Sequence, residues 1–426
     1  MTKRTIVTLS LAVITAFNLQ AGDLTQQYTD LLNEHNLIKA AKQNVQAAKS
    51  KVEVEQTGWT PDITVNADAG KDNYYRKDSD DSHLYTNTVS VTANQLLWDF
   101  GTLNSNIDKA QFGVAKANAE LDKQKQYLML AGLEAQIDLY TANQRVNIAK
   151  QSQNNIKEQT KLESARIDAG RGYTTDLLQA KSQLAQSQAK TIEMEGALTQ
   201  AQNRYKAIFG VDTNLNSEKL TLSIDTLLPK TLNEAITSAL EVQPDLVVSK
   251  ADYTIAKANV KSVSKQELMP KLELVAKYMD EHNPDGLDSD KEQRNIGVQF
   301  SWKYNTGLKA SKAKAVVRYS ANSKNDEYAN VKRQVTENTS NAWNQLQTAM
   351  KREEYLNNTA SILNEFLELA RKERELGKRS LLDVLTAETS LLNAKSDAIA
   401  ANSDVIKAKL NLLLQVSKLD LAILDK

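Results

Sequence analysis

The chain contains no cysteine, and only 19 of its 426 residues are glycine or proline. The absence of cysteine excludes disulfides, thiolate metal sites, a cysteine nucleophile and a lipid anchor on an N-terminal cysteine. An average protein carries about 12 % of glycine and proline together. Because tight turns need these residues, their scarcity predicts few and long elements. It argues against a sandwich, a propeller or a series of short βαβ units.

Charge is balanced, and the residues of common active sites are scarce. Lys plus Arg and Asp plus Glu number 53 each, so no basic excess indicates a nucleic-acid partner. The three histidines, His35, His83 and His282, lack the spacing of metal ligands. Gly170 and Gly172 are not followed by the third glycine of a dinucleotide-binding loop. We therefore expect neither an enzyme nor a cofactor.

The N-terminus has the pattern of an export signal. Lys3 and Arg4 precede an apolar stretch over residues 6–19, and Leu19-Gln20-Ala21 has the small-residue pattern of a cleavage site. The alternative, an N-terminal membrane helix, requires a longer and more apolar stretch. We predict a signal peptide over residues 1–21, and no other segment approaches 18 consecutive apolar residues.

An internal repeat is the strongest pattern in the chain. Three pairs of segments match in the same order along the chain, and they are 36–67 with 245–276, 97–101 with 301–305, and 170–184 with 377–391. In the last pair glycine, aspartate, leucine and alanine recur in the same places. The offsets of these pairs are 209, 204 and 207 residues. Three landmarks in one order, with offsets this similar, indicate a duplicated unit.

We predict two structural repeats, over residues 22–228 and 229–416, and a tail over residues 417–426. Each repeat would begin with a helix, continue with a β-hairpin and end with two long helices. The tail would fill part of a belt around the middle of the helices, where the shorter helices are expected to meet end to end.

Each repeat contains one predicted β-hairpin, over residues 60–98 and 270–304. Ile63, Val65 and Ala67 alternate with polar residues, and the same period of two recurs in the second hairpin. Each hairpin therefore has one apolar and one polar side. In a soluble protein the apolar side would cover a core, whereas in a membrane barrel it would face lipid.

Aromatic residues gather at one end of both predicted hairpins. They are Trp59, Trp98, Phe100, Trp302 and Tyr304. At a membrane–water interface such residues act as anchors. At a junction of strands with helices they would equally serve as ordinary core, and the residue pattern leaves both interpretations open.

Four long helices are predicted over residues 101–169, 173–209, 306–376 and 380–416. At 1.5 Å per residue the longer two would each reach about 100 Å. Leu, Ile, Val and Ala recur at spacings of three and four between polar residues, so each apolar stripe is narrow. This pattern is typical of a coiled coil and not of a globular core.

Two hairpins, four long helices and two related helical turns make the chain resemble the TolC family of outer-membrane channels. The most specific part is Glu375-Leu-Gly377-Lys-Arg379-Ser-Leu-Leu-Asp383. The resemblance implies an α+β membrane protein that forms a homotrimer. Four strands per protomer would build a transmembrane β-barrel, continuous with a long antiparallel α-helical barrel. This coiled-coil tunnel would extend from the outer membrane into the periplasm.

The resemblance also implies a function. The trimer would be a passive exit duct for drugs, other small molecules or secreted proteins, embedded in outer-membrane lipid. Its partners would be a periplasmic adaptor protein and an inner-membrane efflux pump or ABC exporter. The alternative is a structural periplasmic coiled-coil or adaptor protein without a channel of its own. Adaptors carry domains rich in glycine and proline, which this chain lacks.

Finally, the resemblance assigns roles to residues of the two helical turns. The turns that would contact the adaptor comprise Gly170, Arg171, Gly172, Tyr173, Thr174, Gly377, Lys378, Ser380 and Leu381. Arg379 would bond to Thr175 and Asp176 as a latch that holds the tip shut. Read from the residues alone, the two glycines are helix C-caps and the charges are solvated helix ends.

Asp383 matches an acidic ring of the family that faces the lumen. The sequence departs from the family at two nearby positions. Thr386 replaces a second aspartate, and Arg374 replaces a tyrosine. These changes put a double acidic ring and part of the latch in question.

Overall fold

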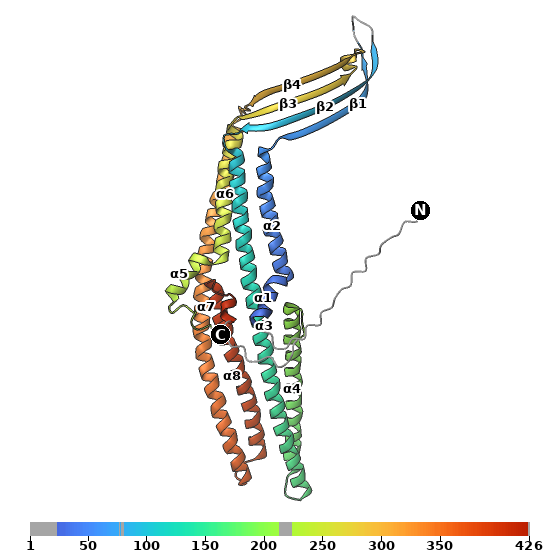
Figure 1. Ribbon diagram of the computed structural model, residues 1–426. Coiled ribbons are helices and arrows are strands. Elements are labelled where there is room, and N and C mark those ends of the chain that lie inside the picture. Colours follow the sequence, from blue (N-terminus) through green and yellow to red (C-terminus); the bar gives the residue numbers. More distant parts are fainter. Residues whose placement is uncertain (1–23, 76, 78–80, 213–223, 425–426) are drawn as a thin grey trace, which may run out of the picture.

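The computed structural model describes residues 24–75, 77, 81–212 and 224–424, so the predicted signal peptide over residues 1–21 lies outside this part of the chain. Figure 1 shows an elongated molecule with a sheet at one end and two helical turns at the other. The molecule is mostly helical and carries one antiparallel sheet of four strands, which confirms the predicted α+β fold.

The elements of the first half are, in order, α1 (Leu24–Glu34), α2 (Asn36–Gln56), the 3-10 helix η1 (Thr57–Trp59), β1 (Asp62–Tyr74), β2 (Ser82–Trp98), α3 (Thr102–Asp168) and α4 (Thr174–Phe209). Those of the second half are α5 (Leu232–Val242), α6 (Pro244–Leu268), β3 (Lys271–His282), η2 (Pro284–Gly286), β4 (Asp290–Ser301), α7 (Lys309–Glu375), α8 (Leu381–Gln415) and η3 (Leu421–Leu424).

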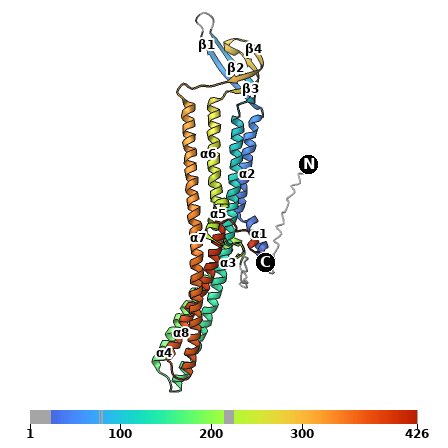
Figure 2. The same cartoon turned by 90° about the vertical axis from the view of Figure 1, so that its left-hand side faces the viewer.

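Two helices run almost the whole length of the helical part. α3 and α7 have 67 residues each, or about 100 Å. The shorter helices pack along them, with α2 and α4 following α3, and α6 and α8 following α7 (Figures 1 and 2). No described helix is both long enough and apolar enough to cross a membrane.

The sheet has the order β1-β2-β3-β4, and every pair is antiparallel. Ile63 pairs with Ala93, Ala93 with Ala276, and Ala276 with Ile296, so these four residues share one face. The opposite face carries Thr64, Thr92, Lys277 and Asn295 at the next level. The register therefore sorts apolar and polar side chains onto opposite faces across all four strands.

The apolar face of the sheet is uncovered. Ile296 is 79 % exposed and Ile63 69 % exposed, although both are surrounded by apolar neighbours on the same face. A continuous exposed apolar surface is expected to contact lipid or another protein. The interpretation of the hairpins as the lid of a soluble core is therefore wrong for this chain.

The strands meet the helices at two sharp bends. Asp99 Oδ2 accepts a hydrogen bond of 2.6 Å from the backbone N–H of Leu103 and so caps α3, while Phe100 adopts a φ of +57°. The corresponding bend before α7 has Leu308 at a φ of +59°. β4 ends at Ser301. Trp302 and Tyr304, which the prediction placed within the hairpin over residues 270–304, therefore follow the strand.

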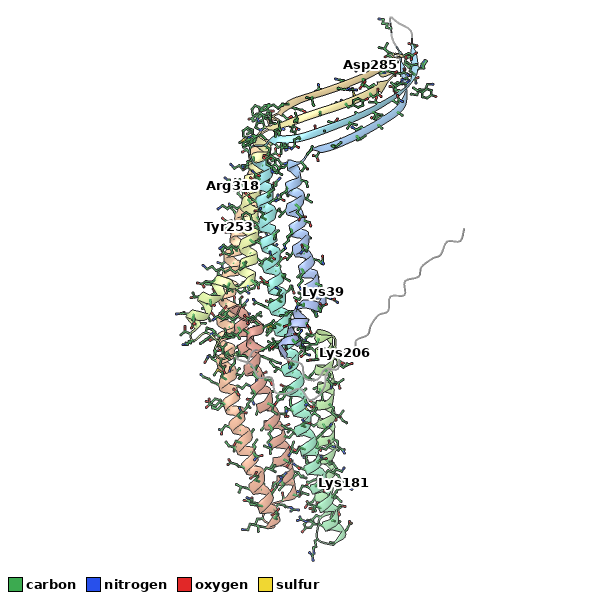
Figure 3. All side chains as sticks on the ribbon, viewed as in Figure 1. Lys39, Lys181, Lys206, Tyr253, Asp285 and Arg318 are labelled. Carbon is green, nitrogen blue, oxygen red and sulfur yellow. The ribbon has the colours of Figure 1, made fainter. Side chains whose placement is uncertain are left out.

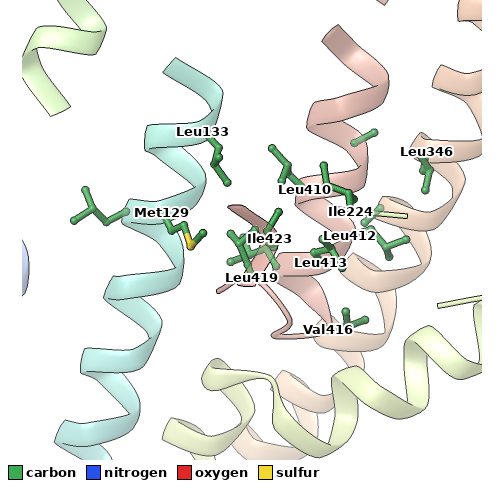
Figure 4. Close-up of a cluster of buried hydrophobic side chains, with 14 of the residues drawn as sticks. Met129, Leu133, Ile224, Leu346, Leu410, Leu412, Leu413, Val416, Leu419 and Ile423 are labelled. Atoms are coloured by element: carbon green, nitrogen blue, oxygen red, sulfur yellow. The ribbon is translucent and has the colours of Figure 1, made fainter. Parts of the chain in front are cut away.

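The main apolar core lies at the middle of the helices, where the shorter helices meet (Figure 4). We call it the belt core. Its fully buried members include Tyr28, Met129, Leu133, Leu410, Leu413, Val416 and Ile423. Leu419, Ile423 and Leu424 come from the predicted tail over residues 417–426, of which residues 425–426 lie outside the described part. Below the belt core, the described residues form smaller apolar clusters between the helices.

Candidate functional site at the helical tips

The two helical turns at the tip have the same backbone geometry. Gly170 and Gly377 have φ values of +72° and +74°, which favour glycine. The N–H of the next residue, Arg171 or Lys378, donates to a carbonyl five residues back, over 2.8 and 2.9 Å. This is a Schellman motif, so both glycines end a helix as well as forming the turn.

Most residues predicted to contact an adaptor lie on the surface of these turns. Arg171, Thr174, Lys378 and Ser380 are exposed, and Tyr173 is 76 % exposed. Gly172 is half-buried, and a Cβ there would lie 2.8 Å from Ile167 Cγ1, which explains why a glycine closes this turn.

Leu381 differs from the other predicted contact residues. It is 3 % exposed and packs with Ile156, Ala180 and Leu385 between the two helical hairpins. Its assignment to an exposed contact surface is therefore incorrect in this conformation. Ser380, directly before it, caps α8 by accepting the backbone N–H of Asp383 over 3.1 Å, and this cap turns the next side chain inward.

The predicted latch partners are not brought together within one chain. Arg379 Nε donates to Glu373 Oε2 over 2.6 Å, and the guanidinium lies 5.2 Å from the centre of the Phe366 ring. Thr175 is exposed and Asp176 half-buried, and neither bonds to Arg379 among the described residues. Arg379 therefore lies against the side of α7 and not against the first turn.

A different ion pair joins the two hairpins near the tip. Arg374 Nη2 lies 3.0 Å from Glu163 Oε2, and the side chain of Glu163 is only 4 % exposed. Arg374 Nη1 also donates to the carbonyl of Arg379 over 3.3 Å. The sequence marked Arg374 only as a departure from the family, and nothing in the pattern around Glu163 pointed to its burial.

A second buried carboxylate lies farther from the tip. Glu388 on α8 accepts from Arg371 of α7 over 2.5 Å and from Asn155 Nδ2 of α3 over 2.8 Å. Its side chain is 7 % exposed. Because hydrogen bonds to charged groups are stronger than neutral ones, these two networks fasten α3 to the α7–α8 hairpin at two heights. We call them the tip clasp (Glu163–Arg374) and the inner clasp (Asn155–Glu388–Arg371).

Asp383 lies on the opposite side of α8 from Glu388. It is exposed together with Thr386, one turn away, whereas Val384, Leu385 and Glu388 are buried. No described residue forms an ion pair with its carboxylate. Glu388 thus lies on another side of α8 from Asp383, and the place of Asp383 in a lumen ring stays a prediction.

The five predicted interface aromatics lie together where the sheet joins the helices. Trp98 and Phe100 form an edge-to-face pair at 6.1 Å, and Trp302 and Tyr304 lie 6.1 Å apart. All five are exposed, from 38 % for Trp59 to 62 % for Tyr304. They do not form a buried core between the described strands and helices.

Two further aromatics, which the sequence analysis missed, lie on the apolar face of the sheet, farther from the helices. Tyr85 is 73 % exposed and carries Lys71 over its ring at 5.6 Å, and Tyr278 carries Arg294 at 5.8 Å. By the register, Tyr278 lies level with Val91 in the middle of the apolar face, so the two tyrosines lie at different heights of that face. Only the register between β1, β2 and β3 shows that these tyrosines share a face.

The described part of the chain contains no group of three or more His, Asp or Glu side chains that could hold a metal ion. The chemistry of the tip is that of charged hydrogen bonds between helices. Such contacts can hold two hairpins together or release them.

Comparison with known proteins agrees with this geometry. The model of the family described as outer membrane efflux protein matches residues 28–211 and 235–415. The outer membrane efflux protein BepC of Brucella suis is 24 % identical over 409 residues, covering 96 % of this chain and 88 % of that protein. The alkaline protease secretion protein AprF of Pseudomonas aeruginosa is 22 % identical, covering 82 % of this chain and 73 % of its own length.

The outer membrane protein TolC of Escherichia coli is 20 % identical over 424 residues, covering 96 % of this chain and 84 % of that protein. Among solved structures, the outer-membrane channel OprN superposes with a TM-score of 0.78 at 18 % identity, covering 93 % of this chain and 90 % of that one.

Proposed function

Because the chain belongs to the outer membrane efflux protein family, whose members are exit ducts in the outer membrane, we propose that it works as a homotrimer whose three sheets close one barrel. The observation that carries this proposal is the sheet itself. β1 and β4 each have one unpaired edge in the described chain, and the apolar face is uncovered. In lipid, unpaired strand edges are not tolerated, so copies of the chain would have to pair them.

The matched ranges of the family model support a duplicated chain. They fall one within each predicted repeat, 22–228 and 229–416. We infer that the hairpins α3–α4 and α7–α8 are equivalent units, and the identical Schellman motifs at their turns are consistent with this. Each unit would then supply two strands to the barrel and one helical hairpin to the tunnel.

At the tip, the two clasps would hold the hairpins together in the closed state. The exposed turns around Tyr173 and Lys378 would present a surface to a periplasmic adaptor that works with an inner-membrane pump or exporter. The latch between Arg379 and Asp176 stays a proposal, and because the two do not meet within one chain it would form between neighbouring protomers. Three copies of Asp383 would form a single acidic ring in the lumen, favouring cations.

Two classes of cargo are compatible with the tip geometry. The relatives include both an outer membrane efflux protein and a protease secretion protein. The alternative of a structural periplasmic protein without a channel has no observation in its favour, since the exposed apolar sheet face would then be in water.

The test is to purify the full-length protein from outer membranes in mild detergent. Light scattering should give the mass of a trimer, and planar bilayers should show small conductance steps from a nearly closed tip. A folded monomer, or a protein that fractionates with the soluble periplasm, would contradict the duct.

A further inference from the structure

A polar cavity lies between α3 and α4, just below the belt core. It has a volume of about 290 Å³, and its described lining comes from these two helices. On α4 it lies between Lys181 and Lys206, which Figure 3 labels. Ala142, Ala197 and Ala201 leave the space open, because larger side chains at these positions would fill it. We call this space the α3–α4 cavity.

The antiparallel packing of the two helices brings an arginine to each end of the α3–α4 cavity. Thr160 of α3 bonds to the carbonyl of Ala180 of α4, and this contact fixes the relative heights of the helices. Arg145 then lies about 6 Å below the level of Thr141, and Arg204 about 8 Å above it. Helical side chains lean toward the N-terminus of their own helix. Arg145 therefore leans upward and Arg204 downward, and both line the same space.

The acidic side chains near the cavity already have partners. Asp138 is the one carboxylate in the described lining, and Lys407 of α8 bonds to it. Glu195 lies about level with Arg145, but its carboxylate lies 2.8 Å from Lys150 Nζ. The α3–α4 cavity therefore keeps the positive charge of its arginines.

The two arginines themselves are unpaired within the described part of the chain. Neither guanidinium takes part in an ion pair or a hydrogen bond there. Arg204 is exposed, whereas Arg145 is half-buried and its Nε is closed off from solvent without a hydrogen-bond partner. Arginine keeps its charge in proteins, and a buried donor left unpaired costs free energy. Both side chains thus have donors to offer to a ligand.

We propose that the α3–α4 cavity binds a small oxyanion with two or more negative charges, of which phosphate is the simplest. A guanidinium group can donate two parallel N–H bonds to the oxygens of such an anion. The side-chain amide of Gln200, which also lines the cavity, supplies a further donor. The volume lies at the lower end of the range for small-molecule sites, roughly 300–1,000 Å³, so it suits a small ion with water.

Equilibrium dialysis tests the site directly. The full-length protein, purified in mild detergent without phosphate, is dialysed against radiolabelled inorganic phosphate, and we expect one saturable site per chain. Arg145→Gln and Arg204→Gln should each weaken binding at least about tenfold, because each removes a charged hydrogen bond to the anion. Arg145→Lys keeps the charge but loses the planar fork, so its affinity should fall between those of the parent and Arg145→Gln.

The matched control is Arg318→Gln. Arg318 is exposed on the upper part of α7 and lies far from the cavity (labelled in Figure 3), so this variant should bind phosphate like the parent. Sulfate should compete with phosphate, whereas chloride at the same ionic strength should not. Because Arg204 is exposed, Arg204→Gln should fold and keeps the test decisive if Arg145→Gln does not.

Three results would overturn the site. They are the absence of saturable binding, binding that is unchanged in both glutamine variants, and displacement of phosphate by chloride as readily as by sulfate. The last would mean a general attraction for anions. Since all the described lining belongs to one chain and dialysis counts sites per chain, none of these results depends on the trimer. Failure of the anion site would therefore leave the duct standing.

Discussion

Two glutamates are nearly removed from solvent at the level of single residues. Glu163 and Glu388 are 4 % and 7 % exposed in their side chains, and each meets an arginine of α7. A buried carboxylate is tolerated only with such partners. Arg374 replaces a tyrosine of the family, and it forms an ion pair of its own with Glu163 between the two hairpins.

The first prediction concerns Glu163→Gln. The change removes the charge of the tip clasp and leaves Arg374 with a weaker partner, so the closed tip should lose about 1–3 kcal/mol per protomer. The planar-bilayer conductance should rise, while the trimer stays intact. Glu158→Gln is the control, because Glu158 pairs with Lys161 on the open surface of the same helix and such pairs contribute little. Equal conductance in parent and Glu163→Gln channels would show that the tip clasp does not hold the tip.

The second prediction concerns Tyr28 in the belt core. Burial raises its pKa well above the ordinary value, with the nearby Tyr205 adding to the effect, and its hydroxyl donates to Gln136 Oε1 over 3.0 Å. The Tyr28 hydroxyl therefore loses its proton at higher pH in the folded state than in the unfolded chain. Its contribution to stability is complete below the ordinary pKa of about 10 and is lost as pH rises above that value.

Melting temperatures measured at about pH 8 and about pH 11 should therefore differ more for the parent than for Tyr28→Phe. Tyr28→Phe should also be less stable at the lower pH by about 1 kcal/mol, through its lost hydrogen bond. Tyr173→Phe, on the exposed first turn, is the control and should follow the parent. A parent curve no steeper than that of Tyr28→Phe would contradict the prediction.

At the scale of elements, the two turns depend on left-handed glycines. Gly377→Ala places a Cβ at a φ of +74° with open space around it, so the cost is backbone strain alone, about 1 kcal/mol. Amide hydrogen exchange in the last turn of α7 should become faster. Gly113→Ala, inside α3 with equally open space, should slow exchange around it because alanine favours a helix. Unchanged exchange at the tip of Gly377→Ala would mean that the turn does not need this conformation.

The loop between β3 and β4 should lie outside the cell. It lies at the end of the sheet farthest from the helices (Figure 1), and Asp288 is exposed there. An epitope inserted after Asp288 should bind antibody on intact cells, as should one inserted between β1 and β2, where part of the chain lies outside the described residues. An epitope after Gly210, near the belt, should react only after permeabilisation. The reverse pattern would invert the orientation.

Elements were more predictable than contacts. The long helices follow from the scarcity of glycine and proline, and the strands follow from alternation at Ile63 and Val65, because both signals are local. The pairing of Arg374 with Glu163 was not predictable, since it joins residues 211 positions apart. Leu381 was misassigned because a motif gives its position in a turn but not the direction of its side chain.

At the scale of the whole molecule, the belt core depends on the tail. Ile423 is fully buried, and Leu419 is 2 % exposed. Ile423→Ala should lower the free energy of unfolding by about 2–5 kcal/mol, the usual cost of a cavity in a core. Urea titration followed by circular dichroism would measure it, with the half-buried Leu421→Ala as a milder control. A loss no greater than that of Leu421→Ala would show that the tail is dispensable to the core.

The belt core also joins the two ends of the chain, since α1 contacts η3 and Tyr28 shares a cluster with Ile423. A chain delivered from its N-terminus can form helical hairpins early, because their contacts are local. The belt cannot be completed until the last residues arrive. Chains interrupted during synthesis would therefore retain an unfinished middle, open to proteases, and only full-length chains would be able to mature.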